Sequence, residues 1–320
     1  MTNVNATPLR IAFVGAGAMT REHAKVFGDI PGAVLAGIWN RTRARSEAVA
    51  TEFGIGQVCS SIAELYERTR ADLVVMSVLE PAANSVARQC FAFPWTVLME
   101  KPPGLNLVDA RDMYTAASER GRTVFVGLNR RFLSSTLAAV RDLATNDGMR
   151  FIHVQDQQDL TALGAFNHPP EILANWMYAN SIHLVDYLRY FGRGAVTGVR
   201  VIQPWDPSRP TVVVAAVEFA SGDIGLYTGL WNGPGPWMVT VSTPARRWEM
   251  RPLEQAQFQN RNERRLQSVE IVDADKAFKP GFRVQAEEVV RAIRHESSTA
   301  PTLADAVETM ELIARIYGHT

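Results

Sequence analysis

Apolar and polar positions alternate in a regular way through the first 127 residues of the chain. Short apolar runs have the length of buried parallel strands, and each is followed by a segment with helical spacing. The apolar runs lie at residues 11–14, 34–40, 71–79, 95–99 and 123–128, and the helical segments at 21–27, 41–55, 60–69, 81–92 and 106–121. Strands that alternate with helices in this way predict a doubly wound parallel sheet.

The pattern changes near Met149, where apolar and polar residues alternate along segments that turn residues separate. Period-two alternation predicts a mostly antiparallel sheet with one open face. Trp176–Phe191 predicts one helix, and residues 283–296 and 303–317 predict two amphipathic packing helices. The predicted strands lie at residues 151–157, 196–203, 211–219, 223–231, 237–243 and 246–250. We therefore expect an α/β domain over residues 1–127 and an α+β domain over 128–320, with the C-terminal helices free to pack back on the first.

Charge and composition exclude several classes of function. The chain has 320 residues, with 33 Lys and Arg against 33 Asp and Glu, so its formal net charge is zero. Nucleic acids and anionic membranes bind net basic faces, so we expect neither as a partner. The N-terminus has no apolar signal core and no window suits a membrane span, which predicts a cytoplasmic protein. Cys59 and Cys90 lack metal-binding spacing, and we expect buried thiols and no metal site.

A glycine turn follows the first predicted strand directly. Gly15 permits a tight turn, and Gly17 lets a pyrophosphate approach the backbone where a Cβ would block it. Ala18 and Met19 begin the next helix, whose free N–H groups and dipole favour phosphate. Taken alone, this pattern also suits a plain strand–helix turn.

The end of the second strand indicates which nicotinamide cofactor binds. NAD enzymes usually carry an Asp or Glu here for the ribose 2′-hydroxyl, whereas this strand ends at Asn40, followed by Arg41 and Arg43. Arginine pairs with a 2′-phosphate that a carboxylate would repel. This pattern favours NADP as the cofactor, with NAD as the alternative. The other interpretation is that both arginines are ordinary solvated charges at the start of a helix.

Two further segments lie at carboxyl ends of predicted strands, where such sheets bind ligands. Ser77, Val78 and Pro81 follow the third strand, and Glu100-Lys101-Pro102 follows the fourth. A lysine here is placed to hydrogen-bond a substrate hydroxyl and to help its proton leave as hydride moves. A surface-loop lysine is the alternative interpretation.

The ordered set GAGAM, EKP and VGLNRRF resembles the Gfo/Idh/MocA oxidoreductase family, of which glucose-fructose oxidoreductase and inositol dehydrogenase are founding types. The resemblance extends over essentially the whole chain. It implies a Rossmann domain, a second domain whose open sheet face forms subunit contacts, and cofactor contacts that include Glu100 and Asn129. Thr20 departs from the family's last glycine or alanine. Asn84 stands where a histidine often contacts the nicotinamide ribose.

The resemblance also implies a second active-site motif, an Asp followed four residues later by His and three beyond by Asp. His183 and Asp186 match this motif, but Ala179 occupies the first position. Asn180 then takes over hydrogen bonding without the ability to titrate. Without the resemblance, a histidine on an apolar helix suits a core residue better than a catalyst. The other expected substrate contacts are Tyr178, Asn129 and His168.

These features predict an NAD(P)-dependent oxidoreductase that transfers a hydride between the nicotinamide and a carbinol or carbonyl carbon of a sugar, sugar derivative or cyclic polyol. Lys101 and His183 handle the hydroxyl proton. The partners would be a carbohydrate-like substrate and further copies of the chain, in a homodimer or homotetramer through the C-terminal sheet. Two alternatives stay open: an NAD-retaining hydrolase or lyase of the same fold, and a nucleotide-binding sensor or assembly protein without turnover. We expect Trp205, Trp231, Trp237 and Trp248 to pack in a core or subunit contact.

Overall fold

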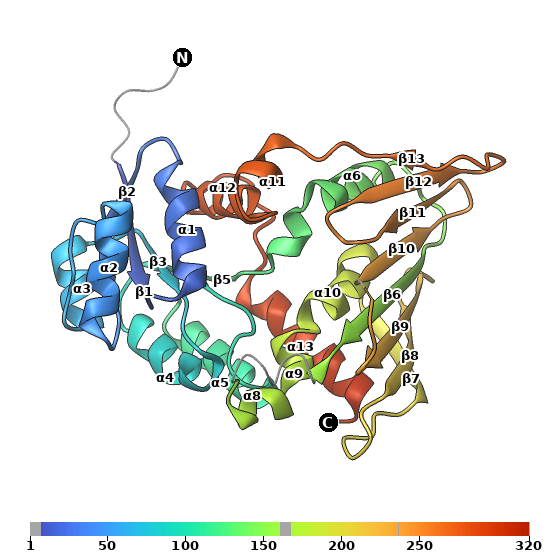
Figure 1. The fold of residues 1–320 in the computed structure, drawn as a ribbon, viewed down its shortest axis with the longest axis horizontal. Helices are drawn as coiled ribbons and strands as arrows, with labels where there is room; N and C mark the ends of the chain where they lie inside the picture. The colour runs from blue at the N-terminus through green and yellow to red at the C-terminus, as the bar shows by residue number, and fades with distance from the viewer. Residues whose placement is uncertain (1–7, 161–167, 236, 320) are drawn as a thin grey trace. The chain divides into compact units, whose positions relative to one another are not determined.

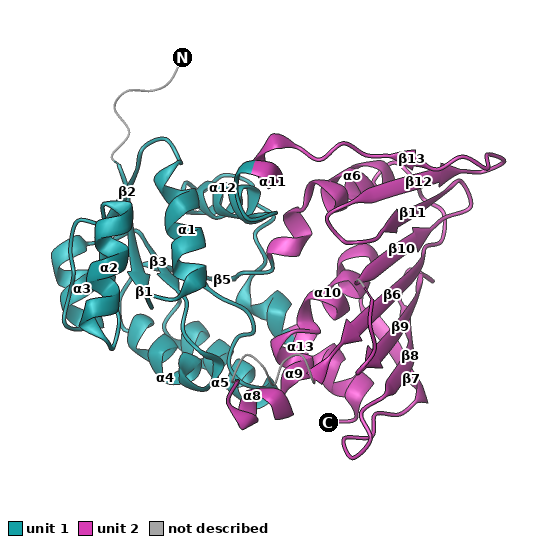
Figure 2. Cartoon of the chain, viewed as in Figure 1, with its two compact units in different colours: residues 1–128, 277–307 teal, residues 129–276, 308–320 magenta. Residues whose placement is uncertain are grey.

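A computed structural model describes residues 8–160, 168–235 and 237–319 and divides them between two compact units. The first unit contains residues 1–128 and 277–307, and the second contains 129–276 and 308–320 (Figure 2). The expected boundary at residue 127 lies one residue from the first break. The structure also assigns residues 277–307 to the first unit, and local sequence patterns do not predict this assignment.

The first unit is built on a five-stranded, wholly parallel sheet with the strand order β2-β1-β3-β4-β5 (Figure 1). Every residue of β3 and β5 is buried, as the continuous apolar runs require. The strands are β1 (Leu9–Val14), β2 (Ala33–Trp39), β3 (Leu73–Met76), β4 (Thr96–Met99) and β5 (Val124–Val126). This arrangement confirms the predicted doubly wound sheet.

Helices connect these strands in sequence, and one helix from the C-terminal part of the chain joins them. Helix α12 (Phe282–Ile293) packs against α1 (Ala18–Gly28), and Phe282, Val289 and Val290 belong to the same buried core as Phe13. The others are α2 (Arg43–Phe53), α3 (Ile62–Thr69), α4 (Glu80–Cys90) and α5 (Leu107–Glu119).

The second unit is built on an eight-stranded sheet with the order β13-β12-β11-β10-β6-β9-β8-β7. Only the β6–β9 pair is parallel, so the predicted mostly antiparallel sheet is confirmed. The strands are β6 (Phe151–Gln158), β7 (Val196–Gln203), β8 (Val212–Phe219), β9 (Ile224–Trp231), β10 (Met238–Ser242), β11 (Arg246–Met250), β12 (Ala256–Asn260) and β13 (Gln267–Ser268). The last two were not predicted, because they are short and polar.

Helices cover one face of this sheet. Helix α10 (Ile182–Phe191) contacts β6, β9 and β10, and α6 (Ser134–Leu143) contacts β11 and β12 (Figure 1). Every second residue of β6, β8 and β9 is buried toward this side, which produces the observed alternation. The remaining helices are α8 (Pro170–Ala174), α9 (Trp176–Ala179), α11 (Asp273–Ala277) and α13 (Leu303–Tyr317), which begins in the first unit and continues in the second. Among the helices that the structure describes, none is long and apolar enough to cross a membrane.

The prediction of one helix over Trp176–Phe191 is wrong. Helix α9 ends at Ala179 and α10 begins at Ile182, because Asn180 leaves the helical region with φ −123° and ψ −46°. The Asn180 side chain donates to Gln158 on β6 instead of facing solvent. A tertiary hydrogen bond therefore accompanies the break in the helix. The periodicity of the sequence does not indicate this break.

Candidate active site

The glycine turn lies at the switch point of the first sheet, between the ends of β1 and β3. Gly15 has φ +110°, a region that favours glycine. A Cβ on Gly15 would lie 2.0 Å from the carbonyl oxygen of Ser77, which follows β3. Because the chain crosses from β2 over β1 to β3, the sheet brings these two segments together at the edge where such folds bind ligands.

The start of α1 has the features that a pyrophosphate needs. Gly17 is the N-cap and makes no side-chain cap, and the first turn holds no acidic residue. A Cβ on Gly17 would meet no atom within 4 Å, so its backbone faces open space. The free N–H groups of the first turn, with Ala18 and Met19, thus fit a dinucleotide phosphate. Lys279 Nζ lies 3.5 Å from Met19 Sδ and adds a cation beside this turn.

The segment after β2 is exposed and mostly held by local contacts. Asn40 donates to the backbone oxygen of Thr42, and Arg43 forms an ion pair with Glu47 one helical turn later at 2.8 Å. Arg41 is exposed, with no ion pair to the described residues. Of the two arginines expected to meet a 2′-phosphate, Arg41 is therefore the one without a carboxylate partner.

Asn84 is held by neighbouring side chains on α4 and α5. Its Nδ2 donates to Asp112 at 2.9 Å and to Asp109 at 3.3 Å, and its Oδ1 accepts from Arg88 at 3.2 Å. Both ends of the amide are therefore occupied within the first unit. Val78 and Pro81, which were expected to contact cofactor, lie just before and at the start of α4.

Glu100 and Lys101 follow β4, and Glu100 turns inward to the protein. Its Oε1 lies 2.7 Å from Nε2 of His23 on α1, and both side chains are largely buried. Burial raises the pKa of Glu100, but the hydrogen bond and the charges of His23, Lys101 and Lys279 hold it below its ordinary value of 4.5. Sequence analysis missed His23 because a lone histidine on a helix gives no signal of its partner.

We expect Glu100→Gln to lower the free energy of unfolding at pH 7 and to flatten its dependence on acid. A depressed pKa contributes stability that is present above the ordinary value of 4.5 and is lost as the pH falls through the folded value. Denaturant unfolding between pH 7 and pH 3 measures this, since the loss falls below pH 4.5. Glu52→Gln, which removes an exposed partner of Arg21, is the control with a small expected effect. An equal change in both variants at every pH would contradict the assignment.

His183 lies in the first turn of α10 and is 8% exposed. Asp186, three residues later, is held by two other side chains. Its two oxygens accept a bidentate pair of bonds from Arg131, each at 2.7 Å, and Oδ1 also accepts from Thr309 at 3.0 Å. This buried pair fixes α10 to Asn129–Phe132, the short 3₁₀ helix that follows β5.

The other expected substrate contacts lie near α9 and the same 3₁₀ helix. Asn129 and Tyr178 are buried, and His168 is half-buried with its ring 5.2 Å from that of Trp176. Asn180 donates to Gln158 Oε1 at 2.8 Å. Ala179 is buried.

Trp237 was expected in a core or a subunit contact, whereas its ring lies beside the candidate catalytic histidine. The ring centroids of Trp237 and His183 are 6.2 Å apart, and the guanidinium of Arg130 stacks on Trp237 at 4.8 Å. Trp231 and Trp248 are buried, as expected for core residues, and Trp205 stacks on Trp231. Nothing in the sequence separates Trp237 from the other three, because only the sheet places β10 beside α10.

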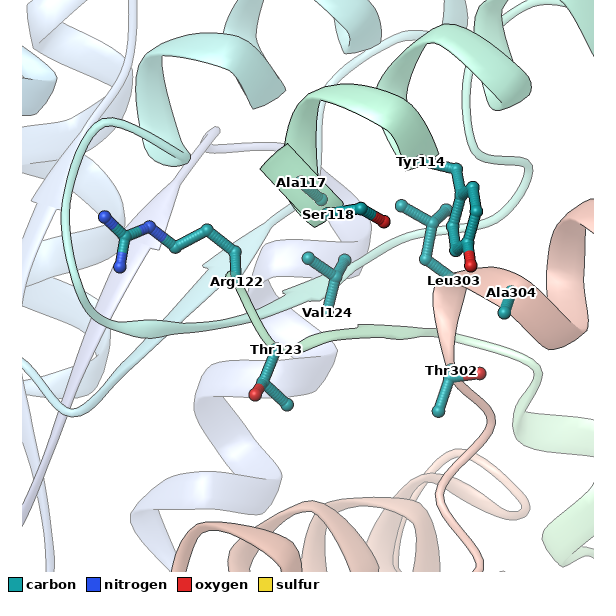
Figure 3. Close-up of a pocket in the computed structure, with 9 residues that line it drawn as sticks. All are labelled: Tyr114, Ala117, Ser118, Arg122, Thr123, Val124, Thr302, Leu303 and Ala304. Atoms are coloured by element: carbon teal, nitrogen blue, oxygen red, sulfur yellow. The ribbon is translucent and has the colours of Figure 1, made fainter. Parts of the chain in front are cut away.

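A pocket of about 250 Å³ lies in the first unit (Figure 3). Its lining includes Thr123 and Val124 at the amino end of β5 and Thr302–Ala304 at the start of α13. Arg122 also borders it, but the guanidinium points away and donates to the backbone oxygen of Phe91. The pocket therefore lies at the edge of the sheet opposite the glycine turn. The described residues hold no group of three His, Cys, Asp or Glu side chains suited to a metal ion.

Comparisons with known proteins agree with this geometry. Residues 9–128 match the family model of the Gfo/Idh/MocA oxidoreductases, described as an NAD-binding Rossmann fold. D-apiose dehydrogenase of Paraburkholderia graminis is 26% identical over 132 residues, which are 41% of this chain and 35% of that protein. 1,5-anhydro-D-fructose reductase of Ensifer adhaerens is 32% identical over 136 residues, 42% of this chain and 40% of that protein. The alignments thus span well under half the length of these relatives.

A solved structure shares the fold over almost the whole chain. Levoglucosan dehydrogenase, in complex with NADH and levoglucosan, aligns with a TM-score of 0.80 over 97% of this chain and 96% of its own, at 16% identity. At that identity the likeness shows the fold alone. Residues 9–128, with the parallel sheet that they form, therefore match the NAD-binding Rossmann domain of the Gfo/Idh/MocA oxidoreductases.

Proposed function

We propose that this protein is an NAD(P)-dependent oxidoreductase that interconverts a carbinol and a carbonyl carbon of a sugar, sugar derivative or cyclic polyol. The observation that carries the proposal is the edge of the first sheet, where the glycine turn packs on Ser77 and Lys101 follows the neighbouring strand β4. The names of the relatives, which are sugar dehydrogenases and reductases, support the substrate class.

In this proposal, the chain supplies binding, orientation and proton transfer. When bound, the nicotinamide supplies or accepts the hydride. Lys101 hydrogen-bonds the reacting hydroxyl through its ammonium group, which favours the developing alkoxide, and His183 takes the proton in oxidation or returns it in reduction. Asn180 and Tyr178 hold the substrate ring. Asp186 fixes α10 through Arg131, so the histidine keeps its place on the helix.

A panel of sugars, sugar acids and cyclic polyols, assayed with added NAD⁺ and NADP⁺ and in reverse with NADH and NADPH, tests the proposal. Turnover that requires added cofactor supports it. Protein that arrives with cofactor bound and turns over without addition would instead indicate a hydrolase or lyase that retains NAD. Binding of NADPH without turnover on any member of the panel would indicate a sensor or assembly protein.

For the cofactor, we propose NADP as the preferred form. Arg41 is free of carboxylate partners among the described residues, and Asn40 holds the position of the usual acidic residue. We expect Arg41→Ala to weaken NADPH binding by about tenfold and NADH binding by less than about twofold, since only NADPH carries the 2′-phosphate. Fluorescence titration measures both constants. Arg45→Ala, also exposed, is the matched control, and equal losses for the two cofactors in Arg41→Ala would contradict the NADP proposal.

We also propose that the uncovered face of the second sheet forms the subunit contact. It exposes part of Leu226 and Leu230 on β9 and of Val212 and Val214 on β8, an apolar surface of the kind found at homo-oligomer interfaces. Sedimentation analysis distinguishes a monomer from a dimer or tetramer.

A further inference from the structure

A chain of buried hydrogen bonds ends at Asn180 in the second unit. Gln158, the last residue of β6, accepts from Asn180 Nδ2 and from Trp176 Nε1, both at 2.8 Å, with the same oxygen, Oε1. Its Nε2 donates to Asp156 Oδ1, and Asp156 Oδ2 accepts from the Tyr227 hydroxyl at 2.7 Å. Asp156 and Gln158 are almost completely buried, at 0% and 3% exposed.

Trp176 determines which way both amides face. An indole N–H can only donate, so the Gln158 atom that faces it must be the carbonyl oxygen. Asn180 faces the same oxygen and must therefore offer its NH₂ group. The carbonyl oxygen of Asn180 is then turned away from the chain of bonds, and no described residue donates to it.

Gln158 has no low-energy alternative orientation. Turning its amide would place Oε1 against the carboxyl oxygen of Asp156 and Nε2 against the N–H of Trp176. The Gln158 NH₂ group would then face the N–H of Trp176, and the Gln158 oxygen would face an oxygen of Asp156, in a site without solvent access. A buried polar group left unpaired is costly, so the network selects one orientation.

We propose that Gln158 is a positioning residue that makes Asn180 a neutral hydrogen-bond acceptor for a substrate hydroxyl. Ala179 occupies the position where the family has a carboxylate, and the outward carbonyl of Asn180 supplies an acceptor one residue later. A hydroxyl donor is thereby selected over an ether or a carbonyl oxygen at that position of the ring. This inference rests on the proposed function only for the identity of the ligand, because the orientation itself is a property of the free protein.

The orientation is tested by Asn180→Asp. The introduced carboxyl group would face Gln158 Oε1, and only its protonated form can donate there and keep an outward acceptor. Its pKa is therefore expected to rise. An acid with a raised pKa loses stability as the pH rises above the unfolded value of about 3.9. Relative to the unchanged protein, we expect the melting temperature of the variant to be lower at pH 8 than at pH 4.5, by roughly 2–4 °C for each unit of that rise.

Two controls separate this effect from a general loss of packing. Asn180→Ala removes the group without adding charge and should show no such pH dependence. Asn180→Asp combined with Gln158→Met removes the opposing carbonyl, and the pH dependence should largely disappear. Asn180→Asp combined with Gln158→Met is informative only if that double variant folds.

A second measurement, by NMR, uses the unchanged protein. The Asn180 side-chain NH₂ resonance, identified by its absence in Asn180→Asp, should exchange its protons slowly with solvent. A stability difference between Asn180→Asp and the unchanged protein that is the same at both pH values would overturn the orientation, as would rapid exchange of that NH₂ group.

The substrate's role is measured with a compound that the cofactor-dependent panel identifies, together with its deoxy and O-methyl analogues. At one hydroxyl position, we expect both the deoxy and the O-methyl analogue to have a kcat/KM about tenfold or more below that of the substrate. In Gln158→Met we expect this difference between substrate and analogues to become smaller, mainly through KM. Unchanged discrimination would overturn the substrate role while leaving the orientation standing. A panel with no substrate would remove the proposed function, whereas the pH experiment would still decide the orientation of Asn180.

Discussion

Replacement of Lys101 by alanine is expected to lower turnover by about 10²-fold or more while NAD(P)H binding changes by less than about threefold. General acid–base assistance contributes on this scale, and in the proposed mechanism the lysine acts on the substrate hydroxyl and not on the dinucleotide phosphates. Lys101 follows β4 at the carboxyl edge of the parallel sheet, next to Glu100, whose side chain turns inward to His23. Single-turnover rates and fluorescence titration of the cofactor measure the two quantities separately.

Lys276, one of the four lysines of the chain, provides a matched control. Lys276→Ala removes an ammonium group that is paired on the surface with Asp273, and it should leave both quantities unchanged. Lys101→Arg keeps the charge but changes its reach and its acidity, and should recover only part of the rate. Full activity in Lys101→Ala would remove the lysine from the mechanism. A loss of cofactor affinity as large as the loss of rate would make it a binding residue.

Asp186→Asn is expected to lower the free energy of unfolding by about 3–5 kcal/mol, because it leaves the buried guanidinium of Arg131 without its counter-charge. The pair is bidentate, with both distances at 2.7 Å, and the two side chains are 10% and 4% exposed. It joins α10 to the 3₁₀ helix at Asn129–Phe132, so the effect should appear in the second unit. Denaturant unfolding followed by far-ultraviolet circular dichroism measures it.

The double replacement Arg131→Met with Asp186→Leu tests the cause. Removing both charges leaves no buried ion unpaired, so most of the lost stability should return. Losses in the double variant that equal the sum of the single losses would show that packing, and not charge, holds α10. If His183 keeps its place on α10 in the double variant, activity should recover along with stability.

Several parts of the fold and of the site were predicted because they depend on neighbours in sequence. The strand, glycine turn and helix at residues 9–28 are local, and a positive φ at Gly15 leaves few residues able to fill the turn. The buried strands appear as apolar runs, and the period-two strands of the second unit appear as alternation. The assignment of Lys101, His183 and the cofactor contacts as functional stays a prediction, since it needs bound ligands or variants.

Other features depend on residues that are far apart in sequence. Residues 277–307 join the first unit because Phe282 and its neighbours on α12 are buried in the core that includes Phe13. The helix break at Asn180 accompanies a hydrogen bond to β6, 22 residues earlier. Trp237 lies near His183 because β10 pairs with β6, which in turn packs on α10. No periodicity within either segment encodes such contacts.

The sequence by itself determined a strand–turn–helix of the kind typical of dinucleotide-binding folds and the two classes of sheet, since each depends on backbone preference or on burial along a single element. Only the tertiary structure decided the partners of the buried polar groups: His23 with Glu100, Arg131 with Asp186, and Gln158 between Asp156, Trp176 and Asn180. The physical reason is that burial requires every donor and acceptor to find a complement, and the fold, not the local sequence, determines which complements lie within reach.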